Sequence, residues 1–348
     1  MNIDNLTATE ILKISLDSPE ELYVVKNEVE LKKVYRKLSM KWHPDRQENK
    51  LDTSSVFAHL QVLYESALKK IGSGIWTNKN ELIIKSDSGS EFELKYLKKE
   101  GFELGQKYIG SSYVMWIFEK ENNDLAKRML SFIKSFKYPN DNMKKEISKN
   151  LPIIKKEFLS DGKQVIILDK DKESINLKDL LIHFNNKIDP KHVAWILSCL
   201  YNLSCYLEYS KIMHGGISIE NIFVNPSQHS LSLLGGWWYA HKDEEKLIAL
   251  NKHAVNIAPP KLIDNKIADK VLNLEMIKLV GRELLGNKNG VYLLKDKSIP
   301  MPLIYWLRDA SGNNAFKEYE FWQNNILKNS FGVRRFTKME IQPSDIYS

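Results

Sequence analysis

Pro44 separates two stretches of helical periodicity near the N-terminus, and this break constrains the first part of the chain. Before it, apolar residues from Leu31 to Leu38 recur at i, i+3, i+4 and i+7, the spacing of one face of an α-helix. Proline ends such a helix, because its ring disfavours helical geometry at the preceding residue and it has no amide hydrogen. The sequence therefore predicts a helix that stops at Pro44, with His43 and Asp45 on an exposed turn.

A second periodic stretch follows the turn. It runs from Phe57 to Ile71, with Leu60, Tyr64 and Ala67 on the same face. Two amphipathic helices joined by a short loop pack antiparallel with their apolar faces together. We expect a short helical run over residues 9–14 to cover the open side of this pair.

The face of the first helix opposite its apolar stripe is positively charged. Residues 31–41 contain no carboxylate and five cations, namely Lys32, Lys33, Arg36, Lys37 and Lys41. Cations on one helix face steer association with a negatively charged partner, and salt weakens that attraction. An ordinary solvated helix surface is the alternative interpretation of the same pattern.

The order of these pieces resembles the J-domain of the DnaJ (heat-shock forty) co-chaperones. That family has a short helix, a basic helix ending in Tyr-Arg-Lys-Leu (here residues 35–38), a His-Pro-Asp turn and a further helix. The resemblance implies that His43, Pro44 and Asp45 engage an ATP-driven chaperone of the heat-shock seventy (DnaK) class and stimulate its ATP hydrolysis. The basic helix would dock on an acidic surface of that chaperone. The connection over residues 15–30 is longer than is usual in the family.

Composition limits what the remainder can be. The 348 residues are enough for two or three domains, and 43% hydrophobic and 27% charged residues are ordinary for a globular protein. No run approaches the roughly twenty apolar residues that cross a bilayer, and the N-terminus lacks the pattern of a secretory signal. We therefore expect a cytoplasmic protein without membrane association.

Cysteine content and charge argue against two further classes. Cys199 and Cys205 lie six positions apart on one predicted helix, so they form neither a plausible disulfide nor a zinc-ligand set. We expect core thiols, no metal and no cofactor. The net charge of +7 could indicate nucleic-acid binding, but lysines stand beside acids in polar loops such as residues 98–100, 144–146 and 155–157. Nucleic acid is therefore not an expected partner.

The pattern changes after the linker Gly72-Ser73-Gly74. Short strands are predicted at residues 81–85, 91–97, 102–109, 113–118 and 163–168. Helices are predicted at residues 125–136, 143–149, 177–184, 190–209 and 269–285. The sequence thus predicts a mostly β part over residues 75–170 and a mostly helical part over residues 171–348.

The residues after the longest predicted helix resemble the catalytic loop of the protein kinase fold, His-Arg-Asp-Leu-x-x-x-Asn followed by an apolar strand. His214, Gly216 and Asn221 stand at its His, Asp and Asn positions. Ala258-Pro259-Pro260 resembles the Ala-Pro-Glu sequence that closes the activation segment, and a turn around Gly101 would replace the Gly-rich loop. The resemblance implies a bilobal α+β domain with the strands as small lobe and the helices as large lobe.

The departures from the kinase pattern bear on activity. Phosphoryl transfer needs one carboxylate to accept the substrate proton and another to hold magnesium. Gly216 stands at the first position and Gly235 or Gly236 at the second, and glycine can do neither. Lys120 is the candidate substitute for the phosphate-pairing lysine, and Glu146 is one candidate for its partner. The sequence therefore predicts a kinase-like domain that is not an enzyme.

Structural roles are expected for what remains. Asn221 alone survives of the metal-binding set, and we expect its amide to satisfy backbone groups of the loop, with His214 a packed core histidine. Trp237 and Trp238 are expected in the core, although their bulk could instead fill the nucleotide position. The aromatic-rich segment over residues 305–336 is likewise expected in the core.

Together the two resemblances imply a multidomain protein similar to phage or bacterial proteins that join these modules, in the host cytoplasm if a phage encodes it. An all-α J-domain over residues 1–72 would precede the kinase-like bilobal domain. The expected function is that of a co-chaperone that stimulates the ATPase of a DnaK-class chaperone, with the kinase-like domain binding an unknown client or assembly protein. Two alternatives stay open: a scaffold that hijacks or inhibits the host chaperone, and an atypical nucleotide-binding switch.

Overall fold

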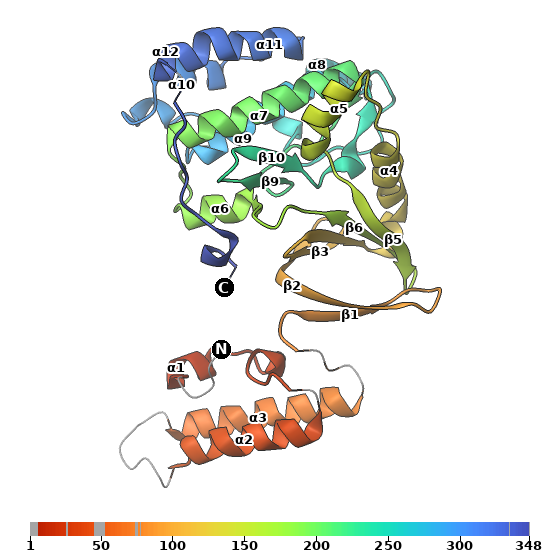
Figure 1. The fold of residues 1–348 in the computed structure, drawn as a ribbon, viewed down its shortest axis with the longest axis vertical. Helices are drawn as coiled ribbons and strands as arrows, with labels where there is room; N and C mark the ends of the chain where they lie inside the picture. The colour runs from red at the N-terminus through yellow and green to blue at the C-terminus, as the bar shows by residue number, and fades with distance from the viewer. Residues whose placement is uncertain are drawn as a thin grey trace. The chain divides into compact units, whose positions relative to one another are not determined.

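The computed structural model describes residues 6–25, 27–44, 53–73, 76, 78–333 and 335–347. Over these ranges the protein is a mixed α+β protein with N-terminal helices, a six-stranded antiparallel sheet and a helical C-terminal region (Figure 1). Its contacts divide it into two compact units, Met1–Tyr96 and Leu97–Ser348. Asp45 of the predicted turn and Gly74 of the predicted linker lie outside the described residues.

The first unit contains a group of helices, followed by β1 (Glu81–Lys85) and the first residues of β2 (Glu91–Phe102). The helices are α1 (Ala8–Leu12), the 3-10 turn η2 (Pro19–Glu21), α2 (Glu28–Lys41) and α3 (Thr53–Gly72). Thr7 caps α1 with a capping box, and the Asn27 side chain caps α2 by accepting from the Glu30 amide at 3.0 Å. α2 and α3 pack together and α1 contacts α3, as the apolar patterns predict.

The contact between α2 and α3 follows the predicted face on one helix and departs from it on the other. Leu31 and Leu38 of α2 are buried, as predicted. The buried residues of α3 are Thr53, Val56, Leu60, Leu63 and Ala67. Phe57 and Tyr64, also predicted on this face, are half-buried, and Tyr64 stacks on Tyr35 with ring centroids 4.1 Å apart. Leu60 and Ala67 are buried as predicted, whereas Val56 and Leu63, which were not predicted on this face, are buried more fully than Phe57 and Tyr64.

The long connection between α1 and α2 contributes to the core of the first unit. Leu22, Tyr23 and Val25 are buried, and the Tyr23 hydroxyl donates to the Leu60 carbonyl of α3 at 3.2 Å. Burial raises the pKa of Tyr23 well above its ordinary value. The extra residues of this segment therefore pack against α3.

The sheet has the strand order β1-β2-β3-β4-β6-β5. Its strands are β1 (Glu81–Lys85), β2 (Glu91–Phe102), β3 (Gly105–Gly110), β4 (Tyr113–Phe118), β5 (Ile154–Ser160) and β6 (Lys163–Asp169). β1 and β4 have the predicted bounds. The prediction of a turn at Gly101 is wrong, because β2 continues through this residue and the turn falls at residues 103–104. β5 was not predicted.

The second unit is mostly helical beyond the sheet. Its helices are α4 (Asn123–Lys134), α5 (Asp141–Ile147), α6 (Leu177–His183), α7 (Pro190–Tyr209), α8 (Pro260–Asn265), α9 (Val271–Leu284), α10 (Met301–Arg308), α11 (Ala315–Phe321) and α12 (Lys328–Phe331). Short strands are β7 (Ile175–Asn176), β8 (Ile212–Met213), β9 (Ile222–Asn225), β10 (Ser230–Leu233) and β11 (His241–Lys242). α7 has the predicted bounds and is the central helix, since it contacts both α9 and α11 (Figure 1).

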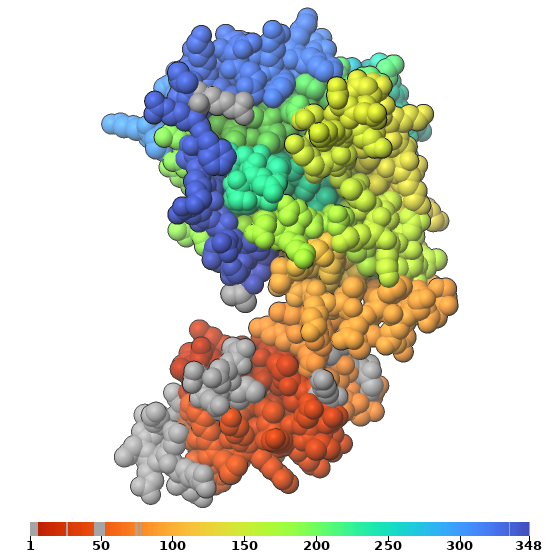
Figure 2. Space-filling view, viewed as in Figure 1, coloured from red at the N-terminus to blue at the C-terminus, as the bar shows by residue number. Residues whose placement is uncertain are grey.

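The C-terminal aromatic residues divide between core and surface. Trp306 and Trp322 are buried and pack on Tyr201, with ring centroids 5.2 and 6.0 Å from it. Tyr305, Phe316, Phe321 and Phe336 are exposed, so the expectation of a core role was wrong for these four. Residues 335–347 then run across the surface of the second unit, the dark blue segment in Figure 2.

Both cysteines carry free thiols. Cys199 Sγ donates to the His229 carbonyl at 3.4 Å and Cys205 Sγ to the Ala315 carbonyl at 3.7 Å, and burial raises the pKa of Cys205 to about 12. Within the described ranges no group of three or more His, Cys, Asp or Glu residues is arranged to hold a metal ion. No helix in those ranges combines the length and the apolarity that a bilayer crossing requires.

Candidate functional site

The cationic residues predicted on α2 lie on the outside of the first unit. Lys32, Lys33, Arg36 and Lys37 are exposed and Lys41 is half-buried. Lys32 pairs with Glu28 one turn earlier at 3.3 Å, and Lys41 donates to the Leu6 carbonyl at 3.3 Å. Lys33 and Arg36 form no ion pair with any described residue. Lys33 and Arg36 therefore present positive charge that the described acids of the chain do not neutralise.

The turn at the end of α2 is anchored on one side and exposed on the other. Trp42 follows the last helical residue and is buried, with the Lys41 ammonium 5.5 Å from its ring. His43 is half-buried and meets the edge of Phe57 in the first turn of α3, with ring centroids 5.6 Å apart. Pro44 is exposed. The helix thus ends where Pro44 requires, and His43 is held beside α3.

His214 occupies the interior of the second unit, between β8 and β9. Its Nδ1 accepts from the Gly216 amide at 3.1 Å, and its ring lies edge-on to Trp237 at 4.4 Å. Burial lowers the pKa of His214 to about 3, so the ring is neutral at physiological pH. An Nδ1 that accepts leaves the hydrogen on Nε2, which is buried without a hydrogen-bond partner among the described residues. His214 is therefore a packed core residue.

The three glycines at the kinase-like positions lie against one another with no room for a side chain. A Cβ on Gly216 would lie 2.7 Å from the Gly236 Cα, and one on Gly235 would lie 2.6 Å from the ring of Trp116. Gly236 has φ +80°, which favours glycine, and it also lacks room for a side chain, because its Cβ would lie 2.5 Å from the Gly216 carbonyl oxygen. The Asn221 amide donates to that carbonyl at 2.9 Å, so it satisfies the backbone of the loop as expected.

A cluster of aromatic rings lies beside these glycines. Trp238 is buried with its ring centroid 4.9 Å from Trp116, 5.2 Å from Phe102 and 5.6 Å from Phe118. Trp116 Nε1 donates to the Leu234 carbonyl at 3.1 Å, which ties β4 to the residue preceding the glycine pair. Trp237 and Trp238 are both buried, as expected for core residues.

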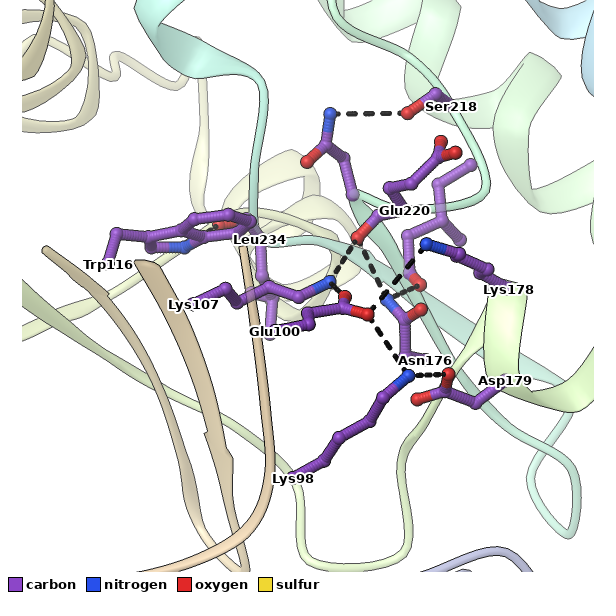
Figure 3. Close-up of polar contacts among 12 residues, drawn as sticks. Lys98, Glu100, Lys107, Trp116, Asn176, Lys178, Asp179, Ser218, Glu220 and Leu234 are labelled. Atoms are coloured by element: carbon purple, nitrogen blue, oxygen red, sulfur yellow. Dashed lines mark hydrogen bonds and ion pairs between the residues drawn. The ribbon is translucent and has the colours of Figure 1, made fainter. Parts of the chain in front are cut away.

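A buried ion network lies beside this aromatic cluster (Figure 3). Lys107 of β3 is only 1% exposed, forms an ion pair with Glu100 of β2 and donates to the Glu220 carbonyl at 3.1 Å. Its ammonium is 5.5 Å from the centre of the Trp116 ring. Burial lowers the pKa of Lys107 against the opposing effect of Glu100. Burial alone would raise the pKa of Glu100, but Lys107 and Lys98 outweigh it and hold that pKa at about 2.

The network continues into α6 and the C-terminal segment. Lys98 pairs with Asp179 of α6 and, at 3.0 Å, with Glu100 (Figure 3). Burial alone would lower the pKa of Lys98, but the carboxylates of Asp179 and Glu100 outweigh it and raise that pKa. The Tyr347 hydroxyl donates to the other carboxylate oxygen of Asp179 at 2.9 Å and accepts from the backbone amide of Asn176 at 3.0 Å. Tyr347 is therefore held by a buried carboxylate.

Lys120 and Glu146 are the sequence-based candidates for the lysine and its glutamate partner in the kinase-like domain. Lys120 is exposed on the 3-10 turn η4 (Lys120–Asn122), where its side chain lies beside Gly162 in the β5–β6 turn. Glu146 is exposed on α5, 4.0 Å from Lys149. The buried lysine is Lys107, and its sequence context contained a signal, since it stands in a strand with the apolar Tyr108-Ile109 and buried lysines require a partner.

The chain matches no protein-family model and no curated protein. Its function is therefore inferred from the residues and contacts described above.

Proposed function

We propose that the helical part of the first unit, residues 1–72, is a J-domain and that the protein acts as a co-chaperone of a DnaK-class chaperone. The observation that carries this proposal is the exposed cationic face of α2, which leads directly into His43 and Pro44. Lys33 and Arg36 have no ion-pair partner among the described residues, so their charge is available to an acidic surface. Such charges speed encounter and fix orientation, and they act less at high salt.

The packing of the unit supports the same proposal. α2 and α3 share a core, and the edge contact of His43 with Phe57 fixes the turn relative to α3. A recognition turn held in one orientation loses less conformational entropy on binding than a free loop does. The turn and the cationic face would thus form one preorganised surface for the chaperone, with Asp45 of the tripeptide outside the described residues.

We further infer that residues 75–348 form a kinase-like bilobal domain that transfers no phosphate and binds a client or assembly protein. The packing of Gly216, Gly235 and Gly236 supports this, because a carboxylate at any of these positions would collide with backbone or with a buried ring. Transfer from Mg-ATP needs carboxylates at these positions. We expect transfer of the γ-phosphate from ATP to the protein itself or to a general protein substrate to stay at background, and transfer above background would contradict this part of the proposal.

The main test is the ATP turnover of a DnaK-class chaperone in the presence of the full-length protein. We expect acceleration by the wild type and none by His43→Gln, since half-buried His43 can be replaced without disturbing the core. At low salt, the double variant Lys33→Glu/Arg36→Glu should reach half-maximal acceleration only at a concentration about tenfold or more above that of the wild type. Lys69→Glu is the matched control, because Lys69 is exposed near the far end of α3 and should leave turnover unchanged.

A refolding assay separates a co-chaperone from an inhibitor of the chaperone. A co-chaperone should raise the yield of a refolded client at substoichiometric amounts. An inhibitory scaffold would bind the chaperone without raising its turnover and would reduce the yield in excess. Absence of both stimulation and binding with the host's own chaperone would overturn the proposal.

A further inference from the structure

A groove of about 810 Å³ lies on the second unit, away from the glycine cluster. It is lined by residues of α7, by His229 in the β9–β10 turn, by the helical segment around α12 and by the first residues of the C-terminal segment. This volume lies within the range of pockets that hold small-molecule ligands, about 300–1,000 Å³. The proposed co-chaperone function uses none of the residues that line it.

Three aromatic rings from separate parts of the chain stack in this groove. Trp195 of α7 lies flat on His229, with centroids 4.6 Å apart and planes 5° apart. His229 in turn stacks on Phe336 at 4.1 Å and 21°. His229 has φ +47°, and its carbonyl accepts from Cys199 Sγ, so the β9–β10 turn holds the middle ring in place. Phe336 ends the stack and is 67% exposed, which leaves ring surface for a further flat group.

The charged residues that line the groove are all cations. Among the described lining residues they are Lys191, Lys328, Arg335 and Lys338, with no Asp or Glu. Lys338 pairs with the exposed Glu340 at 2.9 Å, whereas the other three form no ion pair within the described ranges. The uncompensated charge favours an anionic ligand.

We propose that this groove binds a nucleobase that carries a phosphate. The base would continue the Trp195–His229–Phe336 stack on the outer face of Phe336, and Lys191, Lys328 and Arg335 would hold the phosphate. An aromatic platform next to cations is the combination that binds bases and phosphates without needing sequence-specific contacts. An acidic peptide would use the cations but not a stack of parallel rings, so the ring geometry favours the base.

The same chemistry is offered by a free nucleotide and by a single-stranded nucleic acid. Equilibrium binding to the full-length protein should therefore compare AMP, adenosine, inorganic phosphate and an oligo-dA octamer. We expect AMP to bind about tenfold or more tightly than either adenosine or phosphate, because base and phosphate contribute together. An octamer that binds much more tightly than AMP identifies a nucleic-acid strand as the ligand, and an octamer no tighter than AMP identifies a free nucleotide.

Two groove variants and two matched controls test the site. Phe336→Ala should weaken AMP or octamer binding about tenfold, and Lys328→Glu should weaken it and reduce its salt dependence. Phe316→Ala and Lys317→Glu change an exposed ring and an exposed lysine on α11 outside the groove and should have no effect. The replaced side chains are exposed, so an unchanged melting temperature verifies folding.

Several results would overturn the proposal. One is phosphate binding as tightly as AMP, which would leave the ring stack without a role. Another is binding that Phe336→Ala does not weaken, which would place the nucleotide elsewhere in the protein. Absence of binding by both AMP and the octamer at millimolar concentration would also overturn the proposal. So would binding to the groove by an oligo-glutamate peptide but by neither AMP nor the octamer.

Discussion

Replacing Glu100 by glutamine tests how much the buried ion network stabilises the second unit. In this variant the Lys107 ammonium would stay buried beside the Glu220 carbonyl, 3.1 Å away, and beside a neutral amide oxygen, and would lose the charge of Glu100 that pairs with it. Removing one partner of a buried ion pair costs about 3–5 kcal/mol, because the remaining charge has neither water nor a counter-charge. We expect Glu100→Gln to lower the free energy of unfolding by about 3 kcal/mol at pH 7.

The pKa of Glu100 gives a second route to the same magnitude. Its fall from the ordinary 4.5 to about 2 corresponds to about 3 kcal/mol, at about 1.36 kcal/mol for each unit of pKa. Because the pKa in the folded protein is the lower one, this stabilisation is complete above about pH 4.5 and is lost as the pH falls towards 2. The difference in stability between the wild type and Glu100→Gln should therefore shrink across that window.

Urea unfolding followed by tryptophan fluorescence, at pH 7 and at pH 3, measures both effects. Glu93→Gln is the control, since Glu93 is exposed on the same strand and should change stability by less than about 0.5 kcal/mol. The double variant Glu100→Gln/Lys107→Met should be more stable than Glu100→Gln alone, because it leaves no unpaired buried charge. A loss below about 1 kcal/mol for Glu100→Gln, or a double variant that is the less stable of the two, would refute the reasoning.

Three further substitutions test other parts of the structure, each measured by urea unfolding. Gly236→Ala should cost about 1–3 kcal/mol more than Gly89→Ala, because both have positive φ but only Gly236 of the two lacks space for a Cβ; equal losses would contradict the close packing. Tyr347→Phe should cost about 1 kcal/mol and make the C-terminal residues more accessible to carboxypeptidase. Leu63→Ala should cost about 2–5 kcal/mol and Val62→Ala far less, since only Leu63 is fully buried.

Local patterns predicted the elements that are buried along one face. α7 was predicted with its observed bounds, because Pro190 occupies the first turn, the Asp189 side chain caps it, and a wide apolar stripe runs to Tyr209. β5 was missed for a physical reason. It is the edge strand of the sheet, so Lys155, Lys156 and Glu157 are exposed and the segment has the composition of a polar loop.

The polar network lay beyond local patterns for a different reason. Lys98 and Asp179 are 81 positions apart in the chain, and Tyr347 is 168 positions beyond Asp179. Periodicity reports which face of an element is buried, but not which distant element covers it. The glycines and His214 could be singled out because they fall within short motifs, whereas Lys107 and Glu100 belong to no motif.

The close packing of the glycines bears on where the second unit can act. A carboxylate at Gly235 would have to displace the ring of Trp116, which packs on Trp238 and donates to Leu234. A single substitution therefore cannot rebuild a metal site here, because several buried aromatic contacts would have to move with it. Around these glycines, the interior of this unit is filled by closely packed side chains and backbone. The binding that we propose for this unit is therefore placed on its surface, where the groove beside α7 combines exposed ring area with uncompensated positive charge.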